Sequence, residues 1–180
     1  MVHSSVRNKY IDFNVFPRML KRKGHNMSID LKQSIPIIPI TAQHEEEARL
    51  LILAGLKERF GFLDPSYNSD LTNIIQNYSR KDDLFLVGLH NNTVVCTGAL
   101  TREKSKTGRI QRMSVKKSYR RAGLAKLMIQ TLETSASQVG YGRIVLETNN
   151  DWHSAIEFYK HYGYQVERKD EERSYFSKQI

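Results

Sequence analysis

The stretch YRRAGLAKLM, residues 119–128, places two arginines and a glycine directly before an apolar pattern with helical spacing. The first turn of a helix exposes backbone N–H groups and carries the positive end of the helix dipole. A glycine at that point lets the backbone approach a ligand, and flanking arginines add positive charge. The stretch therefore predicts a site for an anion, most simply a phosphate. The spacing alone equally suits a basic turn with a glycine that starts a helix.

The rest of the chain is expected to form one mixed α/β unit. Runs rich in β-branched and aromatic residues predict strands at 35–40, 83–90, 93–102, 108–117, 143–149, 164–169 and 173–179. Helical spacing of apolar residues predicts helices at 41–63, 71–79, 124–139 and 151–162. Thr41 and Asp151 are expected N-caps, and Gly140 and Gly163 are expected to end helices. Asn91 and Asn92 predict a tight hairpin.

Composition is typical of one globular domain. The chain has 180 residues, of which 39% are hydrophobic and 26% are charged. No apolar run approaches the roughly 18 residues that span a membrane, and the N-terminus lacks signal-peptide features, so we expect a cytoplasmic protein with no membrane partner. The single cysteine, Cys96, is interpreted as a packing thiol rather than a nucleophile. No Cys/His cluster has metal-ligand spacing, so no metal is expected.

The positive charge is concentrated at the N-terminus. Residues 1–26 hold six Lys and Arg and one Asp, a net +5 of the formal +9, which leaves the rest only mildly basic and disfavours nucleic-acid binding. Two interpretations of this extension are open. Lys21 to Gly24 can be encoded by a purine-rich run that resembles a translated ribosome-binding site, so that Met27 is the native start. Otherwise the extension is a basic arm. The functional domain is expected at 27–180.

A second motif lies downstream, in LETNNDWHSAIEFYKHYGY at residues 146–164. Here a strand ends, a helix begins, and the pattern A-I-x-F-Y-x-x-x-G-Y follows. Combined with R-x-x-G-x-A at Arg120, Gly123 and Ala125 and with the order of strands and helices, this motif resembles the GNAT superfamily of acetyl-CoA-dependent N-acetyltransferases over residues 35–180. The P-loop and dinucleotide-binding patterns are both absent, so neither explains the glycine.

The resemblance implies a GNAT fold of the mixed α/β class. Such a fold has a twisted, mostly antiparallel sheet of six to seven strands, flanked by about four helices and splayed in its middle. The strands expected to part are 109–115 and 143–149. The co-substrate implied is acetyl-CoA, whose pantetheine arm would lie between these strands and whose diphosphate would be the anion at the glycine.

The resemblance also implies which residues bind the cofactor. Met113 and Val115 would lend backbone groups to the pantetheine arm. Arg120 would close the phosphate loop. The pyrophosphate would be bound by the backbone amides of Arg121, Gly123, Leu124, Ala125 and Lys126. Trp152 stands where relatives often have an asparagine, so it would either cover the arm or merely cap the core, and Asn150 with its neighbour Asn149 would supply the missing polar contact.

The implied chemistry is direct attack of a neutral amine on the thioester in a ternary complex, with strand amides near Met113 stabilising the oxyanion. Tyr159 matches the family's tyrosine acid, which protonates the leaving thiolate, and its alternative is a core aromatic. Many relatives carry a glutamate base near the start of this strand, at the position that matches Arg109 here. Glu147 is therefore the candidate that binds the acceptor ammonium or relays its proton, unless it simply faces solvent.

The acceptor is expected to be a primary amine on a small molecule. The segments 60–70 and 172–178 would supply an aromatic pocket from Phe62, Tyr67, Tyr175 and Phe176, although each could be a core anchor instead. The alternatives are a protein lysine or N-terminal acetyltransferase, for which a wide groove is expected, and a non-catalytic module that binds acetyl-CoA or nucleic acid. A homodimer is compatible with any of these.

Overall fold

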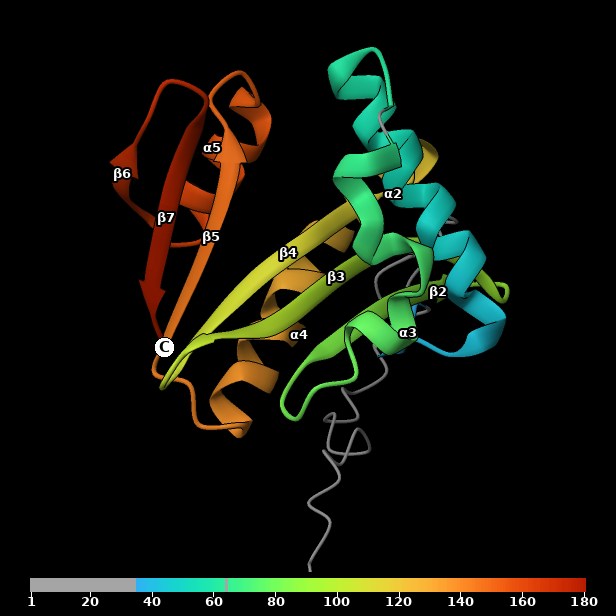
Figure 1. Ribbon diagram of the computed structural model, residues 1–180, viewed down its shortest axis with the longest axis horizontal. Coiled ribbons are helices and arrows are strands. Elements are labelled where there is room, and N and C mark those ends of the chain that lie inside the picture. The colour runs from blue at the N-terminus through green and yellow to red at the C-terminus, as the bar shows by residue number, and fades with distance from the viewer. Residues whose placement is uncertain (1–34, 64) are drawn as a thin grey trace, which may run out of the picture.

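The computed structural model describes residues 35–63 and 65–180 (Figure 1). The predicted extension at 1–26 and the alternative start at Met27 lie outside the described residues. The strands are β1 (Ile37–Pro39), β2 (Leu84–His90), β3 (Thr93–Lys104), β4 (Thr107–Val115), β5 (Arg143–Asn149), β6 (Gln165–Lys169) and β7 (Arg173–Gln179). The α-helices are α2 (Glu45–Phe60), α3 (Ile74–Asn77), α4 (Leu124–Gln138) and α5 (His153–His161). The 3-10 turns are η1 (Ala42–His44), η2 (Pro65–Thr72) and η3 (Lys117–Tyr119).

The strands form one sheet in the order β1-β2-β3-β4-β5-β7-β6. Neighbouring strands are antiparallel except β4 and β5, which run parallel. The parallel pairing joins only Thr107–Arg109 to Arg143–Val145, and beyond it the two strands diverge (Figure 1). We call the divergent part, 110–115 of β4 and 146–149 of β5, the split. The predicted mostly antiparallel, splayed sheet is thus confirmed.

Helices cover both faces of the β2–β4 half of the sheet. In β3, Val94 and Ala99 pack in one core cluster with α2 and α3, whereas Val95 and Leu100 pack in the other with α4. Alternate residues of a strand point to opposite faces, so a strand covered on both faces reads as the continuous apolar run seen in the sequence. On the other half, α5 lies against one face of the β5–β7–β6 arm (Figure 1).

Most predicted boundaries are confirmed at residues with unusual backbone torsions. Asn91 and Asn92 have φ of 50° and 61° in the β2–β3 hairpin, while Gly140 and Gly163 have φ of 89° and 85° just after α4 and α5. The predicted cap at Asp151 is wrong. The N–H of the following residue donates to the carbonyl of Asn149 at 3.1 Å, which forms a tight turn and delays the start of α5.

Thr41 stands at the N-cap position of η1, as predicted, but its side chain does not cap the backbone. Its hydroxyl lies 2.9 Å from Nδ1 of His44, and no side-chain cap bond forms at this end of η1. The helix α2 begins only at Glu45, so the three glutamates that follow one another from there occupy its first turn, where negative charge is favourable.

Cys96 is fully buried in β3, as the packing interpretation predicts. A Cβ atom placed on Gly88 of β2 would lie 2.4 Å from its Sγ, so the thiol fills the space that this glycine leaves. Burial raises the pKa of Cys96 to about 12. The thiolate, which is the reactive form, is therefore strongly disfavoured.

Candidate functional site

The split begins where β4 departs from regular geometry. Thr97 of β3 pairs with Ser114, but Ala99 pairs with Gln111, so Arg112 and Met113 share the place opposite one residue. Arg112 has φ of 55°, and its carbonyl accepts a hydrogen bond from Oγ1 of Thr97 at 2.8 Å. Such a bulge bends a strand and leaves one residue out of the ladder. It therefore frees backbone groups near Met113 beside the split.

Beyond β4, the chain turns through a loop with two left-handed residues, Arg121 at φ 63° and Gly123 at φ 81°. Gly123 is half-buried and directly precedes α4. Among the residues that the structure describes, no group accepts from the backbone N–H groups of residues 121–126. These donors and the positive end of α4 form a concave set of amides suited to an anion. Gly123 is thus not sealed in the core, which keeps the predicted phosphate site open.

Arg120 braces this loop. Its Nη1 and Nη2 donate to the carboxylate of Glu58 on α2 at 2.7 and 2.8 Å, and its Nε donates to the carbonyl of Val115 at 3.2 Å. The hydrogen bond from Arg120 lowers the pKa of Glu58. The side chain therefore ties the end of β4 to α2, in keeping with the predicted closure of the loop. It also engages the carbonyl of Val115, one of the groups predicted to meet the cofactor.

Trp152 lies at the start of α5, where it meets the end of α2. Its ring centroid is 5.2 Å from that of Phe60, and the guanidinium carbon of Arg59 lies 4.5 Å from the ring centroid. The half-buried tryptophan thus joins elements that belong to the two halves of the sheet. Its position is compatible with covering the cofactor arm.

Tyr159 is 9% exposed and packs in the core of the β5–β7–β6 arm. Its ring centroid lies 5.8 Å from that of Tyr164 and 6.0 Å from that of Phe176. Burial raises the pKa of Tyr159 to about 12, while the positive charge of Arg59 acts in the opposite direction. No side chain within the described residues forms a hydrogen bond with its hydroxyl. The core role is observed, and the acid role stays a prediction.

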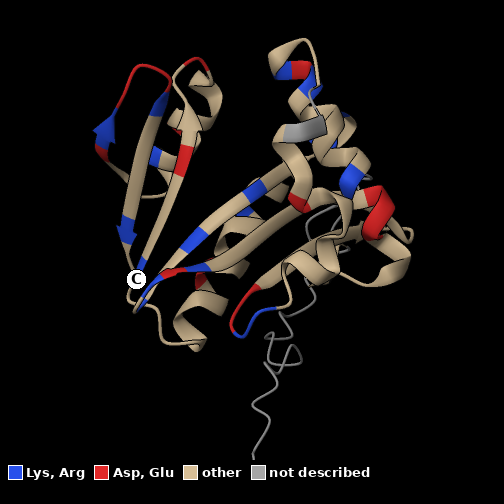
Figure 2. Ribbon diagram, viewed as in Figure 1, with Lys and Arg blue, Asp and Glu red and all other residues tan. Residues whose placement is uncertain are grey.

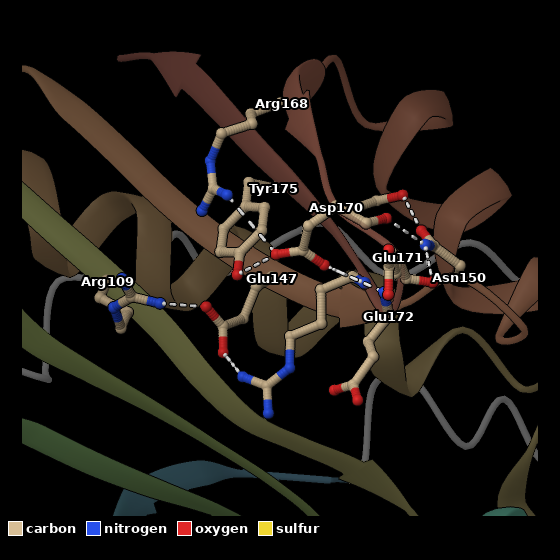
Figure 3. Close-up of polar contacts among 10 residues, drawn as sticks. Arg109, Glu147, Asn150, Arg168, Asp170, Glu171, Glu172 and Tyr175 are labelled. Atoms are coloured by element: carbon tan, nitrogen blue, oxygen red, sulfur yellow. Dashed lines mark hydrogen bonds and ion pairs between the residues drawn. The ribbon is translucent and has the colours of Figure 1, made fainter.

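Glu147 projects from the middle of β5 and is held by two arginines (Figure 3). Oε2 accepts from Arg109 of β4 at 3.2 Å, and Oε1 accepts from Arg173 of β7 at 2.5 Å. Arg109 also donates to Glu103 at 2.8 Å. Since Arg109 is the last β4 residue paired with β5, its ion pair with Glu147 closes the vertex of the split. Arg109, which stands where many relatives are expected to have a glutamate base, therefore pairs with Glu147, the carboxylate considered in its place.

The side chain of Asn150 is hydrogen-bonded to the connection between β6 and β7 (Figure 3). Its Nδ2 donates to the carbonyls of Asp170 and Glu171 at 2.9 and 3.2 Å, and its Oδ1 accepts from Ser174 at 2.7 Å. Both N–H groups of the side-chain amide are thus engaged. This bracing role competes with the predicted contact between Asn150 and the cofactor.

The four aromatics predicted for the acceptor pocket have different fates. Phe176 is 1% exposed and is a core residue, so for it the core alternative is confirmed. Tyr175 is half-buried, donates to Asp170 at 2.8 Å and stacks under Arg168, whose guanidinium carbon lies 3.7 Å from its ring centroid. Phe62 and Tyr67 are 62% and 78% exposed. Three of the four therefore remain available to a ligand.

Sequence reasoning missed a clamp between η2 and the bulge of β4. The guanidinium of Arg112 donates to both carboxylate oxygens of Asp70, at 2.5 and 2.9 Å, and to Asn68 at 3.0 Å. The hydroxyl of Tyr78 also donates to Asp70, at 2.7 Å. A cavity of about 600 Å³ lies beside this clamp, against β3 and α3, and Gln111 and Arg112 from the divergent part of β4 also line it. The sequence signal was weak, since nothing local links Asp70 to a residue 42 positions later.

Two features are absent from the described residues, a metal-binding cluster and a membrane-spanning helix. No group of three or more His, Cys, Asp or Glu side chains there is arranged to hold a metal ion. None of the helices described is long and apolar enough to cross a bilayer. Basic and acidic residues are interspersed along the elements, as Figure 2 shows.

Comparison with known proteins bears on this arrangement. A model of the acetyltransferase (GNAT) family matches residues 50–164. N-acetyltransferase family 8 member 2 of Rattus norvegicus is 32% identical over 102 residues, which is 54% of this chain and 45% of the relative. The chain spans about half the length of the curated relatives that it matches.

Solved structures share the fold. A GNAT-family acetyltransferase of Staphylococcus aureus is 24% identical with a TM-score of 0.73, over 81% of this chain and 98% of the other. The PaiA N-acetyltransferase of Thermoplasma acidophilum, solved in complex with coenzyme A, is 19% identical with a TM-score of 0.71, over 82% and 99% of the two chains.

Proposed function

Because the chain belongs to the acetyltransferase (GNAT) family, we propose that it transfers an acetyl group from acetyl-CoA to a primary amine on a small molecule. The observation that carries this proposal is the set of N–H groups at residues 121–126, which have no described acceptor and lie where β4 leads into α4. A diphosphate matches such a set in charge and in hydrogen-bonding capacity. The parted strands beside it suit an extended ligand that pairs with a strand edge.

The residues around the split fit this co-substrate. The amides of Arg121, Gly123, Leu124, Ala125 and Lys126 would hold the diphosphate. Met113 and Val115 would pair with the amide-containing arm, and Trp152 would cover it. Arg120 would keep the loop in shape through Glu58. Asn150 would act indirectly, by fixing the β6–β7 connection next to the arm.

In the proposed reaction, a neutral amine attacks the thioester carbonyl while both substrates are bound. Backbone N–H groups near Met113 stabilise the negative charge on the carbonyl oxygen. Tyr159 donates its proton to the leaving thiolate. Glu147 binds the acceptor ammonium or relays its proton, and Arg109 with Arg173 holds the carboxylate in place.

The proposal that the acceptor is a small amine rests on a few aromatic side chains. Phe62 and Tyr67 lie exposed after α2. Tyr175 of β7 is paired with Glu147 of β5 in the sheet. Aromatic rings of this kind suit the apolar body of a small amine. A protein acceptor is the alternative, and the experiment below separates the two.

The test is release of CoA thiol from acetyl-CoA over a panel of small amines, lysine-containing peptides and peptides with free N-termini. We expect turnover with at least one small amine and much less with the peptides. Turnover only with peptides would move the assignment to a protein acetyltransferase. Acetyl-CoA binding by calorimetry without turnover on any amine would leave a non-catalytic binder, and no binding heat would overturn the proposal.

A further inference from the structure

The end of α2 carries a cation that the proposed mechanism does not use. Arg59 rests on the ring of Trp152, with 4.5 Å between its guanidinium carbon and the ring centroid. Phe60 packs on the same ring at 5.2 Å. Because α2 packs on β3 and β4 while Trp152 precedes α5 on the other half of the sheet, this contact spans the split. A cation–π contact of this type fixes where the charge sits.

The geometry of α5 places Tyr159 on the same side as Trp152, on which Arg59 rests. Trp152 directly precedes α5, and Ile156 and Tyr159 follow it at spacings of four and three residues, so Trp152 lies at the N-terminal end of the helix face that carries them. Side chains of a helix lean toward its N-terminus, which directs the Tyr159 hydroxyl back toward the turn where Arg59 lies. In agreement, the positive charge of Arg59 opposes the rise that burial causes in the pKa of Tyr159.

The other groups around Tyr159 are neutral or already paired. Tyr164, 5.8 Å away between ring centroids, has a pKa raised by burial and stays protonated. Glu133 of α4 accepts from Lys178 of β7 at 2.8 Å, and that pair lies on the side of Tyr164. Phe158 and Phe176 complete the surroundings with apolar rings. Arg59 in turn has Glu58 and Arg120 as charged neighbours, and these two pair with each other. Arg59 is thus the described charged side chain that rests on Trp152 at the end of the face carrying Tyr159.

We propose that Arg59 is a positioning residue for Tyr159: held on Trp152, it keeps positive charge beside the hydroxyl and makes it a better proton donor. The inference rests on the proposed function. As the carbon–sulfur bond breaks and the carbon–nitrogen bond forms, the thiolate takes the phenol proton. An S–H bond replaces the O–H bond, and the attacking nitrogen loses one proton to solvent as the amide forms. The phenolate left on Tyr159 is stabilised by Arg59 until it takes one proton back from solvent, so that no net proton is gained or lost.

The first test is a double-mutant cycle on kcat for acetyl transfer. We expect Arg59→Gln to lower kcat about tenfold in the wild-type protein and to have no further effect in a Tyr159→Phe background, because it acts through that hydroxyl. Arg59→Lys should restore part of the rate. The control is Arg49→Gln, an exposed arginine of the same helix paired with Glu46, which should leave kcat unchanged. Equal slowing by Arg59→Gln in both backgrounds would overturn the inference.

The second test does not need turnover. A fluorinated tyrosine placed at position 159 has a phenol that ionises at lower pH, within the range where the protein is folded, and its ¹⁹F resonance reports that ionisation. We expect Arg59→Gln to lower the acid dissociation constant of the fluorinated phenol by about threefold or more, whereas Arg49→Gln leaves that constant unchanged. An unchanged titration in Arg59→Gln would contradict the link. If no amine is acetylated by the wild type, the proposed function falls, and this titration still decides whether Arg59 acts on Tyr159.

Discussion

At the scale of single residues, the hydroxyl of Tyr159 is the group on which the proposed proton transfer depends. Tyr159→Phe removes that hydroxyl and keeps the ring that packs on Tyr164 and Phe176. We expect kcat to fall about 100-fold, as is typical for loss of a general acid, while the melting temperature stays nearly constant. Thiol-release kinetics and a thermal melt check the two halves of this statement. A full rate in the variant would leave Tyr159 with its core role only.

Gly123 is a residue whose backbone torsion matters more than its size. At φ 81° an alanine costs about 1 kcal/mol, so it favours other torsions that would shift the neighbouring backbone amides. We expect Gly123→Ala to weaken CoA binding about tenfold in calorimetry. The matched control is Gly142→Ala, where an added Cβ meets nothing within 4 Å and φ is ordinary. Equal CoA affinity in the two variants would place the diphosphate elsewhere.

A substitution at Glu147 can distinguish two roles of its carboxylate, binding of the acceptor amine and structural support through its arginine partners. Glu147→Gln keeps the shape but weakens the bonds to Arg109 and Arg173. If the carboxylate receives the acceptor ammonium, KM for the amine should rise about tenfold while KM for acetyl-CoA stays constant. Glu103→Gln is the control, because it also removes a carboxylate from Arg109 but lies outside the proposed site. A similar loss in both variants would indicate bracing alone.

At the scale of elements, the clamp between η2 and β4 is the contact to test. Arg112 is partly buried and bonded to Asp70 and Asn68, so Arg112→Gln should lower the free energy of unfolding by about 2 kcal/mol. Arg102→Gln, which breaks an exposed pair with Asp82, should cost under about 1 kcal/mol. Urea denaturation measures both. Equal costs would mean that the clamp is an ordinary surface ion pair.

The elements also show what local sequence can specify. Asn91, Gly140 and Gly163 mark ends of elements because they adopt torsions that other residues avoid, so they could be read directly. The cap at Asp151 could not, because a backbone hydrogen bond one residue later outcompeted the side chain. Likewise, the expected helix at 71–79 is divided between η2 and α3, where contacts with distant Arg112 shape the chain.

At the scale of the whole molecule, the splayed sheet was predicted through two motifs and the element order, whereas its ion pairs were not. Arg109 and Glu147 are 38 residues apart, and their contact depends on a parallel register that only the folded sheet defines. The same holds for Arg120 with Glu58 and for Arg59 with Trp152. Motifs therefore located the backbone of the candidate site, and the side-chain connections across it required the tertiary structure.

The buried phenol and thiol predict how the whole protein responds to alkali. Burial raises the pKa of both Tyr159 and Cys96 to about 12, above their usual values of about 10 and 8.5. A group whose pKa is raised on folding stabilises the fold below its unfolded pKa, and that contribution is lost as pH rises toward the folded value. We therefore expect the melting temperature to fall between about pH 9 and pH 12.

Tyr159→Phe tests whether ionisation of Tyr159 contributes to the expected fall in melting temperature at high pH. Burial also raises the pKa of Tyr78 and Tyr164, so the variant lacks one of four such groups, and its melting temperature should fall less steeply over the same range. A melting temperature that is flat in the wild type would contradict the expected loss, and identical slopes in both proteins would remove Tyr159 from it.

The enclosed sulfur of Cys96 has a practical consequence at the bench. Since the chain has one cysteine and β3 seals it against Gly88, a disulfide-exchange dye added to the native enzyme should colour only with free CoA. Acetyl transfer could then be followed continuously without subtracting a protein background. Unfolding in urea should add one dye equivalent per chain, which gives the same reagent a second use as a measure of the unfolded fraction.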